Sequence, residues 1–202
     1  MHGIVFHVKL GSIKDKVARI ERISEYLCEQ LMIDAETKKR VVRAAEICKF
    51  DLATAMIGEK EFTSLQGYMG KEYALLWGED KEVAQAVEEH YLPIGLDVLA
   101  KELEIIDEEE QGFSNNTIPS TIVGQIISLA DKIDTLCAFF GIGIIPSGSK
   151  DQYGLRRAGN SVIKLMYEAR LMVNLKDLVS FANILIREEF TELFSCKTEQ
   201  EI

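Results

Sequence analysis

The stretch from residue 125 to residue 159 constrains the fold more than any other part of this chain. It reads QIISLADKIDTLCAFFGIGIIPSGSKDQYGLRRAG. Up to Phe140 its apolar residues recur at steps of three and four, which predicts a helix with one apolar face. Gly141 and Gly143 end this helix, and a second helix begins near Asp151. The stretch therefore predicts two helices joined by a glycine-containing loop.

The rest of the chain shows the same helical periodicity and no βαβ pattern. Several residues have the chemistry and position of helix N-caps, namely Ser12 (with Asp15 at the capping-box position), Asp34, Asp80 and Asn174. We expect the helix after Asp34 to reach about residue 57, and another helix over 96–106. Gly67 and Gly70 are small enough to allow close helix packing. The sequence predicts an all-α bundle of about seven or eight helices.

We divide the chain into an N-terminal arm and one helical domain. Residues 1–11 contain a short alternating run, IVFHVKL, which is too short to form a sheet alone. We expect this extended arm to continue a preceding domain, with any strand confined to residues 3–9. Residues 12–202 then form a single domain. Within it, the polar segment 107–117, DEEEQGFSNNT, predicts an exposed acidic loop.

Charge and cysteine content narrow the classes of function. The formal net charge of the 202 residues is −10, which argues against a protein that coats nucleic acid. However, residues 141–170 hold five basic and two acidic side chains, so an anion-binding surface is expected there. The four cysteines form no CxxC pair, which favours reduced thiols in a cytoplasmic protein. We find no signal peptide and no apolar run of membrane-spanning length, so no membrane partner is expected.

Two aspartates resemble the metal-binding positions of helical HD-superfamily phosphohydrolases. Asp51 and Asp131 match the two HD aspartates, but Phe50 stands where the histidine before the first aspartate belongs. The whole chain has only three histidines, and imidazole is the usual ligand for the metals of such enzymes. We therefore predict no metal and a structural role for both carboxylates, paired with Lys49, Lys132, an arginine or a backbone amide. A metal-dependent phosphohydrolase acting on nucleotides remains the alternative.

The adjacent arginines Arg156 and Arg157 are open to two interpretations. Adjacent helix residues point about 100° apart, so one of Arg156 and Arg157 can reach Asp131 or Asp134 while the other faces solvent. A buried ion pair and a phosphate contact are both compatible with this pattern. The preceding GIGIIPSGSK lacks the GxxxxGK[ST] spacing of a phosphate loop, so we interpret it as a helix-to-helix connection. No serine, cysteine or lysine has a recognisable nucleophile context, and we predict no catalytic residue.

Long segments of the chain are similar to one known family. They are FHVKLGSIKDKVARI at 6–20, AAEICKFDLATAMIGE at 44–59, LQGYMGKEYALLWGED at 65–80, VAQAVEEHYLP at 83–93 and IISLADKIDTLCAFFGIGIIPSGSKDQYGLRRAG at 126–159. On these residues the chain resembles the central, HD-like helical region of the beta subunit of bacterial glycyl-tRNA synthetase. That subunit is several times longer, so we expect this chain to be a fragment of one.

The resemblance implies an HD-domain-like fold and a place in a two-subunit glycine–tRNA ligase. In that family the alpha subunit binds glycine, ATP and Mg, and the HD-like domain of the beta subunit also lacks the histidines. The resemblance therefore implies a module without a cofactor, inactive alone, that supports tRNA(Gly) placement and assembly with the alpha subunit and the rest of the beta chain. We expect any tRNA contact at Lys150, Arg156, Arg157 and Lys164. The acceptor arm is the favoured target, because the sequence offers no obvious aromatic stacking platform.

Overall fold

The computed structural model describes residues 3–54, 65–94, 117–147 and 151–190. These residues form seven α-helices, one short 3-10 helix and a two-stranded hairpin, in the order β1, β2, α1, α2, η1, α4, α5, α7, α8, α9. The predicted all-α bundle is confirmed. The predicted helix over 96–106, nearly all of the acidic loop 107–117 and Cys196 lie outside the described residues.

The N-terminal arm is a small antiparallel hairpin rather than a single extended strand. Strand β1 (Val5–His7) pairs with β2 (Gly11–Ser12), so the two residues of β2 lie beyond the predicted segment 3–9, and that limit is wrong. Gly11 has a φ of 74°, which turns the chain back at a position that favours glycine. Leu10 at the turn is fully buried in the main core, which holds the hairpin against the bundle.

The first two helices begin at the predicted caps. Ser12 and Asp15 form a complete capping box at the start of α1 (Ile13–Gln30), and the Asp34 carboxylate accepts the first amides of α2 (Ala35–Ile47). The predicted extension of α2 to residue 57 is wrong. The helix ends at Ile47, and the chain then forms the 3-10 helix η1 (Phe50–Ala53). This break lets the polar ends of Lys49 and Asp51 reach buried partners instead of following the helix surface.

Helices α4 (Tyr68–Leu76) and α5 (Lys81–Glu89) pack closely against each other. Gly70 permits this approach, because a Cβ atom there would lie 2.8 Å from Val87 Cγ1. Gly67 serves a different purpose, since it precedes α4 with a φ of 85°. The predicted close packing is thus confirmed at Gly70.

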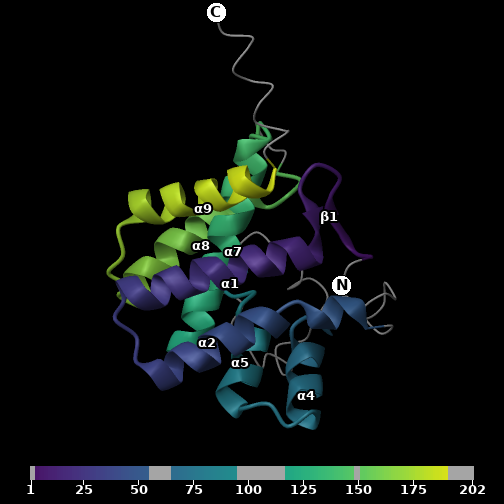
Figure 1. Ribbon diagram of the computed structural model, residues 1–202, viewed down its shortest axis with the longest axis vertical. Coiled ribbons are helices and arrows are strands. Elements are labelled where there is room, and N and C mark those ends of the chain that lie inside the picture. Colours follow the sequence, from purple (N-terminus) through teal and green to yellow (C-terminus); the bar gives the residue numbers. More distant parts are fainter. Residues whose placement is uncertain (1–2, 55–64, 95–116, 148–150, 191–202) are drawn as a thin grey trace, which may run out of the picture.

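Helix α7 (Ile122–Gly141) is the centre of the bundle, and five of the other described α-helices pack on it. In Figure 1 it runs behind α1, with α8 (Leu155–Glu168) and α9 (Leu175–Glu189) towards one end and α2 and α5 towards the other. Fourteen of its residues are buried, which explains the broad apolar face of its sequence. None of the described helices combines the length and apolar character needed to cross a bilayer.

Candidate functional site

A cluster of buried charges joins α7 to α1. Asp131 and Asp134 lie about one turn apart on α7, and Asp134 is fully buried. The Lys16 ammonium lies 2.8 Å from Asp131 Oδ1 and donates to Asp134 Oδ2 at 2.9 Å. Arg19 Nε donates to Asp134 Oδ1 at 2.6 Å, and its Nη1 donates to Glu189 on α9 at 2.8 Å. Cations from α1 therefore neutralise both carboxylates of the central helix.

A third cation, Lys49, lies between Asp131 and a buried histidine. Its ammonium donates to Asp131 Oδ2 at 2.7 Å and lies 2.8 Å from His90 Nε2. His90 Nδ1 lies 2.7 Å from the Val87 carbonyl oxygen. Because a carbonyl only accepts, Nδ1 carries the proton and Nε2 accepts from Lys49. The imidazole is therefore neutral and held as the C-cap residue of α5.

The charges in this cluster reinforce one another. Burial alone would raise the pKa of Asp131, but the Lys16 and Lys49 ammonium groups overcome it and hold the pKa well below the usual 3.8. Burial, reinforced by the Lys49 charge, holds the pKa of His90 well below 6.5. Asp131 therefore stays ionised and His90 neutral throughout the physiological pH range. A cation that approached Asp131 would have to displace two ammonium groups.

Asp51, the other carboxylate at an HD position, binds backbone amides. It is fully buried, and its two oxygens accept the amides of Leu52 at 2.9 Å and Gly67 at 2.7 Å. Burial raises its pKa above 3.8. Phe50, which replaces the HD histidine, packs with its ring centroid 4.9 Å from that of Trp77. Asp51 thus ties η1 to the start of α4, as the predicted bond to a backbone amide requires.

Lys132 on α7 binds the carbonyl end of α5 rather than Asp131. Its ammonium donates to the carbonyls of His90 at 3.2 Å and Leu92 at 2.9 Å, and to Ser128 Oγ at 2.9 Å. Burial lowers its pKa from 10.5 to about 7. In the part of the chain that the structure describes, no group of three or more His, Cys, Asp or Glu side chains converges to hold a metal ion.

The predicted tRNA-contact cations occupy different environments. Arg156 is exposed, Arg157 is half-buried, and both lie in the first turn of α8. Lys164 pairs with Glu168 at 2.8 Å on the same helix. Lys150 lies outside the described residues. Neither arginine is needed by Asp131 and Asp134, which pair with Lys16, Lys49 and Arg19.

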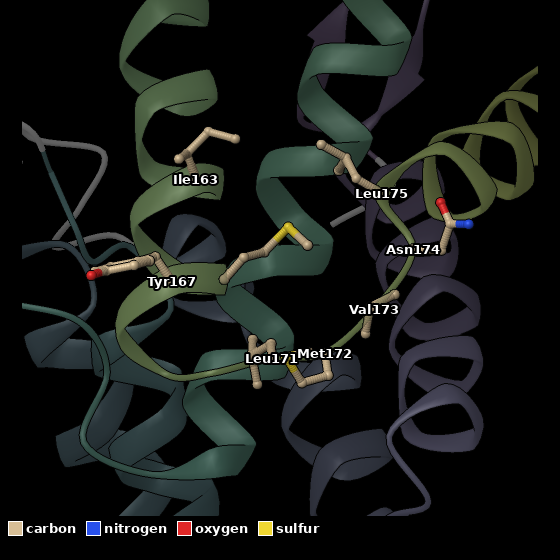
Figure 2. A pocket seen from close by; sticks show the side chains of 8 residues that line it. Ile163, Tyr167, Leu171, Met172, Val173, Asn174 and Leu175 are labelled. Atoms are coloured by element: carbon tan, nitrogen blue, oxygen red, sulfur yellow. The ribbon is translucent and has the colours of Figure 1, made fainter.

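Two hollows lie along α8, one near its start and one near its end. One, of about 420 Å³, is bordered by Arg157, Lys132 and Tyr91. The other, of about 570 Å³, is an apolar groove at the far end of the helix, and none of the described residues that line it is charged. Figure 2 shows Ile163 and Tyr167 on α8 and Met172 on the connection to α9 around this groove. Only the first hollow has groups that suit an anion.

Sequence reasoning missed most of the charged centre. It singled out Asp131 and named Lys49 as one of several possible partners, but it did not name Lys16 or Arg19. These two residues sit on the face of α1 that also carries its apolar residues, and their burial at 4% and 3% exposed could have been suspected from that position. The partners of these two cations could not be inferred from the sequence, because Lys16 and Asp134, for example, are 118 residues apart.

The fold and the centre together define an all-α domain built around a buried, charge-paired central helix. A family profile described as "Glycyl-tRNA synthetase beta subunit" matches residues 1–200. The chain therefore belongs to the glycyl-tRNA synthetase beta-subunit family, as the resemblance predicted.

Individual relatives agree with this assignment. The glycine–tRNA ligase beta subunit of Bacillus subtilis (strain 168) is 40% identical over 195 residues, which cover 96% of this chain and 26% of the relative. The beta subunit of Streptococcus thermophilus (strain ATCC BAA-491 / LMD-9) is 46% identical over 164 residues, which cover 81% of this chain and 21% of the relative. The beta subunit of Acaryochloris marina (strain MBIC 11017) is 39% identical over 192 residues, which cover 95% of this chain and 24% of the relative. The chain thus spans about a quarter of the length of these relatives.

Proposed function

We propose that this chain is a non-catalytic helical module of a glycine–tRNA ligase beta chain. It helps to place tRNA(Gly) and to hold the alpha subunit and the rest of the beta chain together, while ATP and Mg bind to the alpha subunit. The observation that carries this proposal is the Lys49 ammonium between His90 and Asp131. At the position of an HD aspartate, the chain provides its own buried cation.

The rival function is a metal-dependent nucleotide phosphohydrolase. It requires a divalent cation on Asp131, which Lys16 and Lys49 already neutralise at 2.8 and 2.7 Å. We expect the purified chain to hold no stoichiometric transition metal by elemental analysis and to release no phosphate or nucleoside from nucleotides with added manganese. Manganese-dependent hydrolysis that is lost in Asp131→Asn would establish the rival function instead.

The tRNA part of the proposal is supported by the charge of the α8 region. Residues 141–170 hold five basic and two acidic side chains in a chain of net charge −10, and Arg156 is exposed at the start of α8. Basic side chains contact the phosphate backbone, and such contacts weaken as salt rises. A structured arm of the tRNA can lie across this surface without a sequence-specific contact.

The test is charge reversal in the two-subunit enzyme. We expect Arg156→Glu and Lys164→Glu to raise the KM for tRNA about threefold to tenfold at low salt, and to leave glycine-dependent pyrophosphate exchange unchanged. Lys176→Glu, an exposed cation on α9 outside the basic stretch, is the matched control. If the KM for tRNA is the same in all three variants and the wild type at low salt, the module is a spacer and makes no tRNA contact.

A further inference from the structure

The cavity beside the first turn of α8 combines two basic side chains with two aromatic ones. About 420 Å³ in volume, it lies within the range of small-ligand sites. The side chains that matter for its chemistry are Gln66, Tyr91, Lys132, Tyr153, Arg157 and Ser161. None of the described residues that line it is acidic. The cavity therefore suits an anionic ligand with an apolar or aromatic portion.

Arg157 provides the cation at its wall. The side chain is half-buried, and no side chain in the described part of the chain forms a hydrogen bond or an ion pair with its guanidinium. Gly154 allows the guanidinium to lie against the backbone, because a Cβ atom there would be only 3.0 Å from Arg157 Nη2. A positioned, unpaired guanidinium matches the planar, bidentate geometry of a phosphate.

Lys132 provides a second basic group at the base of the cavity. Its ammonium is already bound to the carbonyl end of α5 and to Ser128, so it contributes positive charge rather than a free donor. Burial lowers its pKa to about 7, so a nearby anion would favour its charged form. The charge of this site thus increases when an anionic ligand binds.

Two tyrosines, Tyr91 and Tyr153, supply the aromatic part of the cavity wall, which the sequence did not reveal. Tyr153 lies before α8 and stacks on Phe139 of α7, with ring centroids 4.3 Å apart and an interplanar angle of 25°. Gln66 Nε2 donates to the Tyr91 hydroxyl at 2.8 Å. Phe139 of the core therefore supports the Tyr153 ring, and Gln66 holds the Tyr91 hydroxyl. A fixed aromatic ring near a free guanidinium is a common arrangement for binding one unpaired nucleotide.

We propose that this cavity binds a single unpaired nucleotide of the tRNA, with its phosphate on Arg157 and its base against Tyr153. This inference rests on the proposed function and names the part of the tRNA that the domain holds. Base-paired nucleotides cannot enter, because their Watson–Crick edges are occupied and their neighbours hold them in the stack. The cavity would therefore add a nucleotide-sized contact to the backbone contacts of the exposed cations.

The first test measures RNA binding by the 202-residue chain. The probes are a fluorescein-labelled single-stranded pentaribonucleotide and a blunt RNA duplex of the same sequence. We expect Arg157→Gln to weaken single-strand binding about tenfold and Tyr153→Leu about fivefold. Tyr153→Phe, which keeps the ring, should bind like the wild type, and so should Lys176→Gln. If Tyr153→Phe loses as much affinity as Tyr153→Leu, or duplex binding falls as much as single-strand binding, the proposal is wrong.

Competition distinguishes a nucleotide from any small anion. A nucleoside 5′-monophosphate should displace the pentanucleotide at a concentration at least about tenfold lower than inorganic phosphate, because only the nucleotide can also stack. Equal competition by the two would reduce the site to an anion site and overturn the proposal. Circular dichroism of each variant shows whether a loss of binding reflects unfolding, and Tyr153→Phe provides the folded reference.

The second test separates this inference from the function on which it rests. In the two-subunit enzyme, Tyr153→Leu should raise the KM for tRNA about fivefold while Tyr153→Phe does not. If Arg156→Glu and Lys164→Glu raise that KM but Tyr153→Leu leaves it unchanged, the module contacts tRNA and the cavity does not. If none of these variants changes it, both the proposed tRNA contact and the cavity site fail.

Discussion

Replacing Lys49 with methionine removes the cation at the buried centre while keeping the length of the side chain. The Lys49 ammonium bonds to Asp131 Oδ2 at 2.7 Å and to His90 Nε2 at 2.8 Å, and lies 4.1 Å from the centre of the Tyr91 ring. Breaking a buried ion pair costs about 3–5 kcal/mol. Asp131 keeps Lys16 at 2.8 Å, so its charge is not left alone. We therefore expect a loss of about 3 kcal/mol at about pH 8.

The cost of this substitution should depend on pH through His90. In the wild type the folded-state pKa of His90 lies well below 6.5, so only the unfolded chain takes up this proton as the pH falls below 6.5. The wild type consequently loses stability with falling pH. Without the Lys49 charge the folded-state pKa of His90 rises, so the variant loses less stability than the wild type as the pH falls. Between about pH 8 and pH 5.5 the cost of Lys49→Met should shrink by up to about 1.4 kcal/mol.

Urea unfolding, followed by far-ultraviolet circular dichroism at each pH, measures both effects. Lys38→Met is the matched control, because Lys38 pairs with Glu29 at 3.3 Å on the surface and should contribute less than about 0.5 kcal/mol at any pH. A loss below about 1 kcal/mol for Lys49→Met at about pH 8 would contradict the structural role assigned to this cation. A cost that grows as the pH falls would contradict the pKa argument for His90.

Three further substitutions test a helix contact, a buried ion pair and a helix cap. Gly70→Ala should lower the free energy of unfolding by about 1–3 kcal/mol, because the new methyl group would lie 2.8 Å from Val87 Cγ1, and an unchanged urea midpoint would refute this contact. Asp134→Ala should cost about 3–5 kcal/mol in urea unfolding, since Arg19 loses its 2.6 Å partner; a cost under about 1 kcal/mol would argue against a buried pair. Ser12→Ala should cost about 1 kcal/mol by removing the capping box, and thermal melting should show a lower Tm than for the wild type.

Local signals explain why most helix boundaries were predictable. A cap such as Ser12 or Asp34 acts on amides two or three residues away, so its pattern is contained in a short stretch of sequence. The end of α2 was not predictable in this way. Its apolar periodicity continues past Ile47, whereas the helix ends there and Asp51 accepts the amide of Gly67, a partner 16 residues further on.

The aromatic side chains show the same limit at the proposed binding site. The sequence offers no obvious stacking platform for a base. Tyr153 precedes α8 and Tyr91 follows α5, and the packing of these two connections brings both rings to one cavity with Arg157. Whether a ring lines a cavity depends on the elements around it, which periodicity does not describe.

The all-α class, the caps of α1, α2, α5 and α9, and the importance of the stretch that forms α7 and α8 could all be inferred from the sequence alone. Each of these depends on helical period or on contacts within a few residues. The identity of the cations that neutralise Asp131 and Asp134 depends instead on how the helices pack. Burial makes an unpaired carboxylate costly, so each needs a partner, but the demand can be met by any cation that packing brings near. Here α1 and the segment after α2 bring Lys16, Arg19 and Lys49.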